Sequence, residues 1–374
     1  MWAKRVAVVA VAAAVAAVGA VGGVAPAAWA GGQGEPMVGD LNHDGFVDQA
    51  MLESAPSVTR APLLDCTVSV RLGKSGGGYL PPTRYPYLTL DGAEASCPDL
   101  GVAVDLGGND TIELVLAWFG GRPYPVEHDL LILENFKASA GFDAIFQPSF
   151  IGLADFNGDG RQDVYQWTDQ GDGFSTYLNT PDGGLTPGPI AWCSGRPQYT
   201  LADFNGNGAM DVVIAYVEGC ADYFTGVVAI RDDGVAWHLQ GDPYGDHMWT
   251  VKVQNTNGDR IPDVVTRDTV TGEVTYFVGN GDGSFVKTPK AAADKVSVSN
   301  RKKTSIQVLS NDAASRQAKI TIVTAPRYGT VRVTSNRTVV FTPNSKTGKS
   351  DRFVYRLTDQ GRSSDAAVSI KITN

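Results

Sequence analysis

The sequence predicts an all-β protein in two parts, a long repetitive part followed by a small β-sandwich. Gly and Pro number 43 and 20 among 374 residues, which favours many turns between short strands. A nine-residue pattern of Asp, Asn and Gly recurs between strand-like runs at intervals of about 50 residues. From about Ala291 the pattern stops, and seven short β-runs with alternating apolar residues fill the remaining segment.

The N-terminal segment has the features of a secretory signal peptide over residues 1–30. Lys4 and Arg5 precede an Ala, Val and Gly run from 6 to 24, and Ala28-Trp29-Ala30 resembles a cleavage site. The alternative is an uncleaved membrane anchor, which the weakly inserting Ala-rich run disfavours. No second apolar run of spanning length follows. We therefore expect no integral membrane segment after cleavage, and a secreted or cell-envelope location.

The cysteine content agrees with export. Four cysteines occur, an even number, so two disulfides are expected in an oxidising compartment. Of the three possible connectivities we favour the two local pairs, Cys66–Cys97 and Cys193–Cys220. Cys193 and Cys220 lie almost symmetrically about the repeat at 203–211, so a hairpin would bring them together.

Charge divides the chain where the repeats stop. Residues 31–289 contain 13 Lys and Arg against 35 Asp and Glu, a net charge of −22. Residues 290–374 contain 16 basic and 5 acidic residues, a net charge of +11. Opposite signs on adjacent segments predict two domains, 31–289 and 290–374, with different surfaces.

The repeat has four close copies and one eroded copy. The close copies are DLNHDGFVD (40–48), DFNGDGRQD (155–163), DFNGNGAMD (203–211) and NTNGDRIPD (255–263), and the eroded copy is DLGGNDTIE (105–113). The first positions are spaced by 65, 50, 48 and 52 residues, which suggests five structural units.

Each close copy carries Asp or Asn at positions 1, 3, 5 and 9. Oxygens at alternate positions of a curled loop converge on one point, and the free choice at position 7 fits a backbone carbonyl ligand. These features predict structural Ca²⁺ sites. The predicted ligands are Asp40, Asn42, Asp44, Phe46 and Asp48; Asp155, Asn157, Asp159, Arg161 and Asp163; Asp203, Asn205, Asn207, Ala209 and Asp211; and Asn255, Asn257, Asp259, Ile261 and Asp263.

The four close copies and the eroded copy are not expected to bind calcium equally well. Gly45, Gly160 and Gly208 are expected to make a sharp turn at position 6, where a side chain would clash. Arg260 breaks the rule, so we expect the 255–263 loop to bind more weakly or to have another shape. The 105–113 loop has Gly107 at position 3 and is expected to be empty.

The loops have two alternative interpretations. An EF-hand would need Glu at position 12 in a helix, but strand-like runs such as DVVIAY (211–216) follow position 9. Asx-rich turns without a metal remain open for any single copy. Four copies with clustered acceptors and no nearby cation favour bound ions, because neighbouring carboxylates otherwise repel one another.

The loops and the strands around them resemble FG-GAP/VCBS repeats, the blade units of β-propellers such as integrin α-subunit heads. The resemblance covers about residues 40–289. It implies a β-propeller of about five blades, although related propellers often have seven, with each loop joining the first two strands of a four-stranded blade. The elements VLSND (308–312), APRYGTV (325–331) and DRFVYRLTD (351–359) resemble bacterial Ig-like, cadherin-like repeats. That resemblance implies a small Ig-like β-sandwich over 290–374.

The sequence favours binding over catalysis. No G-x-S-x-G, HExxH or phosphate-binding glycine motif occurs, although a carboxylate pair could lie among Glu113, Glu127, Glu134, Glu218 and Glu273. We predict a secreted, calcium-binding, non-catalytic adhesion protein that recognises an extracellular glycan or protein. The alternative is a secreted hydrolase or lyase that acts on polysaccharide.

The basic C-terminal segment suggests two electrostatic partners. It could dock against the acidic repeat part, or bind an anionic cell-wall polymer. Nucleic acid is a poor candidate, because no aromatic stacking platform accompanies the charge. Trp192, Trp237 and Trp249 are candidates for a sugar-binding platform, whereas Trp118 and Trp167 are expected to lie in the core.

Overall fold

The protein is described by a computed structural model that covers residues 31–32, 35–59, 63–90, 96–119, 128–168, 173–220, 223–300, 302–314, 317–344, 349–359 and 362–373. These residues form strands and turns with no helix, as predicted for an all-β protein. Within the same ranges, no helix is long and apolar enough to cross a membrane. The predicted signal peptide, 1–30, lies outside the described residues.

The repeat part forms five antiparallel sheets, numbered here in chain order. The first contains β2 (Met37–Gly39), β3 (Asp48–Pro56), β4 (Leu64–Arg71) and β5 (Thr83–Tyr87). The second contains β6 (Leu100–Val104), β7 (Glu113–Ala117), β8 (Leu130–Glu134) and β9 (Lys137–Phe142), with β1 (Gly31–Gly32) added beside β6. The third contains β10 (Phe150–Ala154), β11 (Asp163–Trp167), β12 (Phe174–Asn179) and β13 (Leu185–Trp192). The fourth contains β14 (Gly195–Ala202), β15 (Asp211–Val217), β16 (Thr225–Ile230) and β17 (Ala236–Asp242). The fifth contains β18 (Trp249–Gln254), β19 (Asp263–Asp268), β20 (Val274–Gly279) and β21 (Phe285–Lys287).

Neighbouring sheets pack face to face through separate apolar cores. Leu116 and Val68 belong to a core between the first and second sheets, and Val102 and Val164 to one between the second and third. Further cores join the third sheet to the fourth and the fourth to the fifth. Side chains that alternate along each strand therefore serve two cores, which explains why the inner strands β7 and β15 are apolar on both faces.

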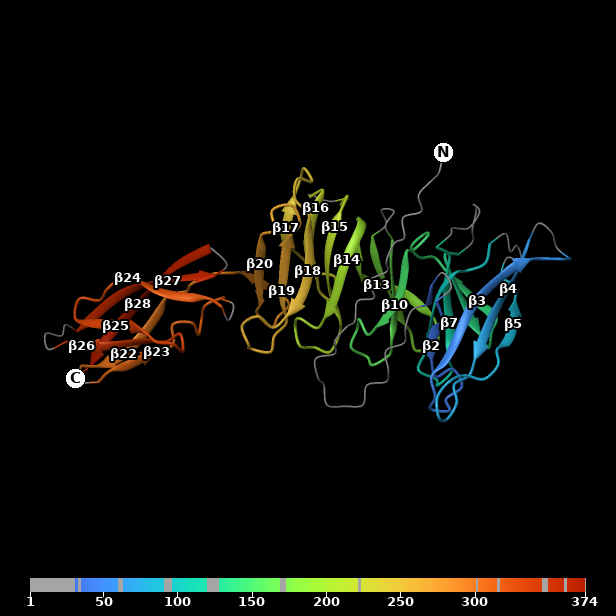
Figure 1. Ribbon diagram of the computed structural model, residues 1–374, viewed down its shortest axis with the longest axis horizontal. Helices are drawn as coiled ribbons and strands as arrows, with labels where there is room; N and C mark the ends of the chain where they lie inside the picture. The colour runs from blue at the N-terminus through green and yellow to red at the C-terminus, as the bar shows by residue number, and fades with distance from the viewer. Residues whose placement is uncertain are drawn as a thin grey trace.

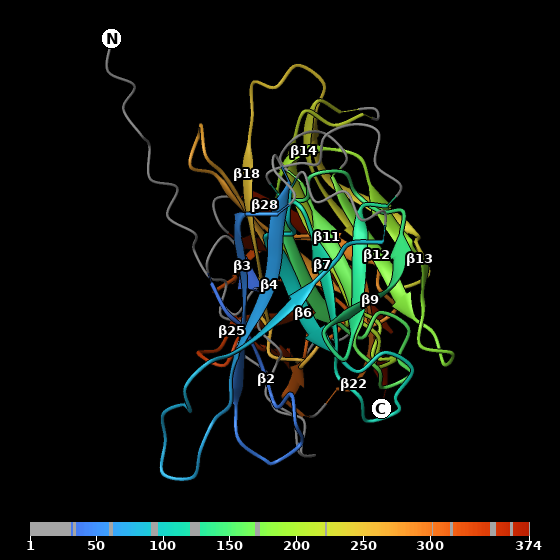
Figure 2. The ribbon, with the colours of Figure 1, turned by 90° about the vertical axis from the view of Figure 1, so that its right-hand side faces the viewer.

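The five sheets follow one another along the long axis of the molecule (Figure 1), and Figure 2 shows successive sheets behind one another from the end of the first. Among the described residues, no apolar core joins the fifth sheet to the first. The predicted count of five sheets agrees with the structure, but closure into a propeller ring is not shown. The outer face of the first sheet is polar, with Arg84 paired to Glu53 at 2.9 Å, as suits an exposed end.

The C-terminal module is the predicted seven-stranded sandwich. One sheet has the order β22-β28-β27-β24, and the other has the order β23-β26-β25. The strands are β22 (Asp294–Ser299), β23 (Thr304–Ile306), β24 (Lys319–Thr324), β25 (Gly329–Val333), β26 (Val339–Pro343), β27 (Ser350–Asp359) and β28 (Arg362–Thr373). Phe341, Phe353 and Tyr355 fill the core between the sheets. Arg362 pairs with Glu273 and donates to Thr275 Oγ1 at 2.9 Å, which connects the module to the fifth sheet.

Both predicted disulfides are present. Cys193 and Cys220 flank β14 and β15, with their Cα atoms 5.6 Å apart, and so close the hairpin as expected. Cys66 in β4 is bonded to Cys97, which precedes β6. This second bond therefore ties the first sheet to the entry of the second, so it does more than close a segment within one sheet.

Candidate metal-binding loops

Each nine-residue loop joins the first two strands of its sheet, as the repeat resemblance implied. Position 6 adopts a left-handed backbone, with φ of +84°, +87° and +93° at Gly45, Gly160 and Gly208. A Cβ at these glycines would meet no atom within 4 Å, so the backbone angle requires glycine and the expected side-chain clash is wrong. Arg260 has the same conformation, with φ of +78°, so the 255–263 loop keeps the turn at the cost of a strained residue.

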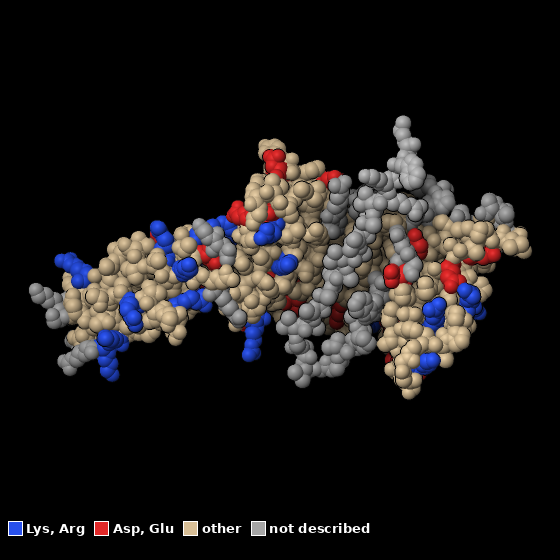
Figure 3. All heavy atoms as spheres, in the orientation of Figure 1, with Lys and Arg blue, Asp and Glu red and all other residues tan. Residues whose placement is uncertain are grey.

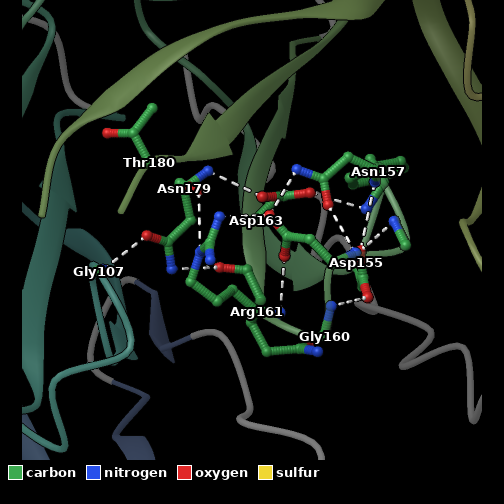
Figure 4. A network of polar contacts seen from close by, with 12 residues as sticks. Gly107, Asp155, Asn157, Gly160, Arg161, Asp163, Asn179 and Thr180 are labelled. Carbon is green, nitrogen blue, oxygen red and sulfur yellow. Dashed lines mark hydrogen bonds and ion pairs between the residues drawn. The ribbon is translucent and has the colours of Figure 1, made fainter. Parts of the chain in front are cut away.

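The loop at 155–163 is wound around its own acceptor side chains (Figure 4). Asp155 Oδ1 accepts the Gly158 N–H at 2.7 Å, and its Oδ2 accepts the Gly160 N–H at 2.8 Å. Asn157 Oδ1 accepts the Asp159 N–H at 3.0 Å, and Asp159 Oδ1 accepts the Arg161 N–H at 2.9 Å. The side chains at positions 1, 3 and 5 therefore turn toward the loop backbone rather than outward.

The other close copies repeat this scheme with one exception. Asp40 Oδ2 and Asp203 Oδ2 each accept the position-6 N–H at 2.9 Å. In the fourth copy, Asn255 Oδ1 instead accepts the Gly258 N–H at 2.5 Å. These shared hydrogen bonds to main-chain amides show that the Asp and Asn side chains hold the loop conformation without requiring a bound ion.

The position-9 aspartate has a structural role that the sequence did not reveal. Asp163 is fully buried; its Oδ2 accepts the Phe156 N–H at 2.7 Å and its Oδ1 accepts the Asn179 N–H at 2.8 Å. It thus holds position 2 of its own loop and the turn after the third strand of the same sheet. Asp48, Asp211 and Asp263 make the same pair of bonds in their sheets. We call these four residues the hairpin clamps.

Burial raises the pKa of three hairpin clamps, Asp163, Asp211 and Asp263. The pKa of Asp163 rises to about 6, although the amides of Asn179 and Phe156 oppose the effect. The pKa of Asp211 rises to about 7 through burial and the nearby Asp232 carboxylate. Even the eroded copy retains the arrangement, because the buried Glu113 accepts the Leu106 N–H at 2.8 Å.

Adjacent loops are connected across the sheets. Asn179 accepts the Gly107 N–H at 2.8 Å and donates from Nδ2 to the Asp105 carbonyl at 2.8 Å, which joins the eroded loop to the third sheet (Figure 4). The Met210 N–H donates to the Asp155 carbonyl at 2.8 Å. The loops at 105–113, 155–163 and 203–211 therefore form one continuous polar edge.

The 203–211 loop gains a carboxylate from a separate turn. Asp232 follows β16, and its two oxygens accept Nδ2 donors of Asn205 and Asn207, each at 2.9 Å. This acid lies opposite positions 3 and 5 of the third copy. Position 5 is Asn207 in this copy, whereas the other three close copies have Asp there. No pattern in the sequence identified Asp232, because it belongs to a turn outside the repeat.

The donors in the loops suit a hard cation in type, since positions 1, 3 and 5 offer carboxylate or amide oxygens. Two observations qualify this. Across the described ranges, no three His, Cys, Asp or Glu side chains are gathered as a metal-binding group; the predicted ligands also include Asn side chains and backbone carbonyls. The expectation that no cation lies near the loops is wrong for 155–163, where the Arg161 guanidinium pairs with Asp159. Ligation at the predicted positions stays a prediction.

The candidate catalytic glutamates do not form a site where the structure describes them. Glu113 is buried against its loop, Glu273 pairs with Arg362, and Glu127 lies outside the described residues. Glu134 and Glu218 are exposed in different sheets. A small pocket lined by Trp118, Asp129, Phe146 and Gln147 contains one carboxylate.

The described tryptophans pack against other side chains and do not form a sugar-binding platform. Trp118 and Trp167 belong to the cores between sheets, as expected. Trp192 packs against Tyr216 and His238, Trp237 lies beneath Arg231, and Trp249 stacks on His247. These three candidates therefore lie in separate places and do not build one sugar-binding surface.

Comparisons with known proteins agree with the repeat and the sandwich. A family model described as an FG-GAP-like repeat matches residues 155–214, and one described as a bacterial Ig domain matches residues 286–371. No curated protein matches the chain. Two solved structures show a weak likeness: the endo-fucoidan hydrolase MfFcnA4 from glycoside hydrolase family 107 and a variant of that enzyme.

The two likenesses carry no argument about fold or activity. The enzyme is 12% identical with a TM-score of 0.20, covering 86% of this chain and 38% of the other. The variant is 14% identical with a TM-score of 0.19, covering 94% and 43%. This chain thus spans less than half the length of either solved chain. The family matches, with the geometry above, show that the protein contains an FG-GAP-like repeat and a bacterial Ig domain.

Proposed function

We propose that this is an exported, calcium-binding, non-catalytic protein that recognises a glycan or protein at the cell envelope or outside the cell. FG-GAP and bacterial Ig domains fit an extracellular adhesion or binding role, and the two disulfides are consistent with that location. The observation that carries the calcium proposal is the series of loops whose position 1, 3 and 5 side chains all turn inward.

In each close copy, the ion would be held by the position 1, 3, 5 and 9 side chains and the position-7 carbonyl. Calcium bound there would neutralise carboxylates that lie a few residues apart and stiffen the turn between two strands. The hairpin clamp keeps the loop attached to the sheet with or without the ion. For Asp203, Asn205 and Asn207, the nearby Asp232 supplies negative charge that the amides lack.

Thermal unfolding of the full chain with and without calcium tests this proposal. Extracellular sites bind with Kd of about 10⁻⁴–10⁻³ M, so about 10 mM calcium should stabilise each occupied loop by about 1–3 kcal/mol relative to EDTA. The double variant Asp155→Ala, Asp159→Ala should lose part of this shift. The matched change Asp143→Ala, Asp365→Ala removes two exposed acids outside the loops and should keep it. A melting temperature that EDTA and calcium leave unmoved contradicts the calcium proposal.

Binding to a glycan array, followed by product analysis of each bound glycan, tests recognition. We expect retention without a change in the glycan, because the described glutamates do not converge. Release of shortened or unsaturated products would instead support the hydrolase or lyase alternative. The two readouts are independent of the calcium experiment.

A further inference from the structure

One face of the four-stranded sheet in the C-terminal module is not covered by the sandwich. Along β27, Phe353, Tyr355 and Leu357 point into the core, and the alternate residues point away from it. The same alternation holds in β22 and β28, where Val298, Val368 and Ile370 are buried. The sheet thus presents a broad outer face formed by four adjacent strands.

The charged side chains on this outer face are mostly basic. Lys295 from β22, Lys319 from β24, Arg352 from β27 and Lys371 from β28 are all exposed on it. We call these four residues the cationic face. Arg356 also lies there, but it donates to Asp365 at 2.7 Å and is therefore neutralised. Asp365 is the acid on this face among the described residues, and the four residues of the cationic face have no acidic partner there.

The strand register places three of these charges close together. Ser369 pairs with Lys295 on one side and with Arg352 on the other, so the two cations lie two strands apart, roughly 10 Å. Lys371 is the next outward residue along β28 beyond Ser369. Ser297, Ser350 and Ser369 lie between the charges and add exposed hydroxyls. The arrangement is a flat row of cations separated by small polar groups.

The second sheet of the module provides an internal comparison. Its outward residues are Ser305, Thr330, Arg332, Val340 and Thr342, with one basic residue among them. The acid nearest to Arg352 in sequence, Asp351, turns away and accepts the amides of Arg327 and Tyr328 at 2.9 and 2.7 Å. The outer face of the four-stranded sheet is therefore the more basic of the two sheet faces, while Lys302, Lys303 and Arg327 lie elsewhere on the module. In Figure 3 most of the charged side chains visible on the module are basic.

We propose that the cationic face binds a linear anionic glycan lying across the strands. Spaced, unpaired cations on an open sheet match an extended polyanion, and serine hydroxyls can hydrogen-bond to sugar oxygens. No aromatic side chain lies among the outward residues named here, which disfavours single-stranded nucleic acid. The acidic loops of a second copy fit less well, because their carboxylates are already engaged by their own backbone amides. The inference rests on the proposed extracellular binding role and specifies its anionic partner.

Affinity measurements on the full chain test the cationic face. The probes are heparin and polygalacturonate, two glycans that carry sulfate and carboxylate, and polyphosphate, an anionic polymer without sugar, each titrated at low salt and at 0.15 M salt. The variant Lys295→Gln, Arg352→Gln, Lys371→Gln should weaken binding of the preferred polymer about a hundredfold at low salt. The matched variant Lys302→Gln, Lys303→Gln, Arg332→Gln removes the same charge elsewhere on the module and should weaken binding less than threefold. Salt dependence should fall only in the first variant.

Several results would overturn the inference. Equal losses in both variants would mean that diffuse charge, not this face, attracts the polymer. Tighter binding to single-stranded DNA than to both glycans would assign the face to nucleic acid, and tighter binding to polyphosphate would show that the face does not select a glycan. Self-association that only the first variant abolishes would assign it to a second copy, and absence of binding to every probe would also overturn it. Binding of a neutral glycan in the array experiment would still support the proposed recognition role if the cationic face bound no anionic glycan. Failure of this inference can therefore be distinguished from failure of the proposed function.

Discussion

The repeat part and the C-terminal module both carry an excess of one charge, but they differ in whether the charged side chains are bonded within the protein. In the repeat part, the excess is acidic and is engaged by the chain itself: Asp163 and Asp155 each accept main-chain amides within one sheet. In the module, the excess is basic, and Lys295, Arg352 and Lys371 stand on an open face without acidic partners in the described structure. Charges of one region shape the fold, and charges of the other remain available to a partner.

This difference teaches that net charge alone does not identify a binding surface. A carboxylate that accepts buried amides contributes to folding, because removing it leaves donors without partners. A lysine on an open sheet face contributes little to the stability of the fold and can bind a partner. The comparison therefore makes opposite predictions for substitutions in the two regions.

The largest effect is expected at a hairpin clamp. Asp163→Ala leaves the buried amides of Phe156 and Asn179 without acceptors, which should lower the free energy of unfolding by about 3 kcal/mol even in EDTA. Urea denaturation followed by Trp fluorescence measures this in the repeat part, since every Trp precedes residue 250. Arg352→Ala should change the free energy of unfolding of the C-terminal module, followed by far-UV circular dichroism of the full chain, by less than about 0.5 kcal/mol.

Position 1 supplies the control for that experiment. Asp155→Ala also removes an acceptor of backbone amides, but those amides lie in an exposed loop where water can replace it. We expect a cost of about 1 kcal/mol in EDTA, together with a reduced response to calcium. Equal costs for Asp155→Ala and Asp163→Ala would remove the distinction between loop-shaping acids and hairpin clamps.

The module also contains a buried carboxylate, Asp294, which gives a smaller, pH-dependent effect. Asp294 Oδ2 is buried with no hydrogen-bond partner, and burial together with the Asp312 carboxylate raises its pKa to about 6. Burial also raises the pKa of Asp312, which accepts the Tyr355 hydroxyl at 2.8 Å and the Ala292 amide at 2.7 Å. The folded module therefore holds a proton more tightly than the unfolded chain.

The sign of the pH effect follows from that difference. With a folded pKa above the unfolded value near 3.8, stability is highest below about pH 4 and falls as pH rises through 6. Asp294 is partly exposed, so we expect a discounted loss of about 1–2 kcal/mol. Hydrogen exchange of β28, corrected for intrinsic rates, should show this loss, and Asp294→Asn should reduce it to the part that Asp312 contributes. Asp365→Asn, at an exposed ion pair, should leave the profile unchanged; a profile that Asp294→Asn does not alter contradicts the assignment.

Local patterns in the sequence predicted much of the architecture. Alternation predicted the seven strands of the sandwich, and the repeat frame predicted which strands each loop joins, because both depend on residues close in the chain. The Cys193–Cys220 bond could be predicted for the same reason, since a hairpin brings those residues together. Ring closure could not be derived in this way, because it depends on how the first and last sheets meet.

The candidate site was predicted less completely. Acceptors within each nine-residue loop were identified, but the second bond of every hairpin clamp goes to the end of the third strand or to the turn after it, 16 to 25 residues away. Asp232 was missed for the same reason, since its link to Asn205 spans 27 residues. The role of glycine at position 6 was identified, but its cause was not, because open space around a missing Cβ is a property of the folded loop.

The smallest predicted effect separates backbone strain from side-chain crowding in the loops. Gly160 and Arg260 occupy the same position 6 with φ of +87° and +78°, and glycine adopts this region without penalty. Arg260→Gly should therefore stabilise the repeat part by about 0.5–1 kcal/mol, and Gly160→Ala should destabilise it by about 1 kcal/mol although a Cβ there meets nothing. Urea denaturation in EDTA measures both without interference from calcium. Gly173→Ala is the crowded counterpart, because its Cβ would lie 1.7 Å from the Trp192 carbonyl, and it should cost more than Gly160→Ala. If Gly160→Ala were neutral, backbone strain could not explain the glycines at position 6, and selection by a bound ion would be the better explanation.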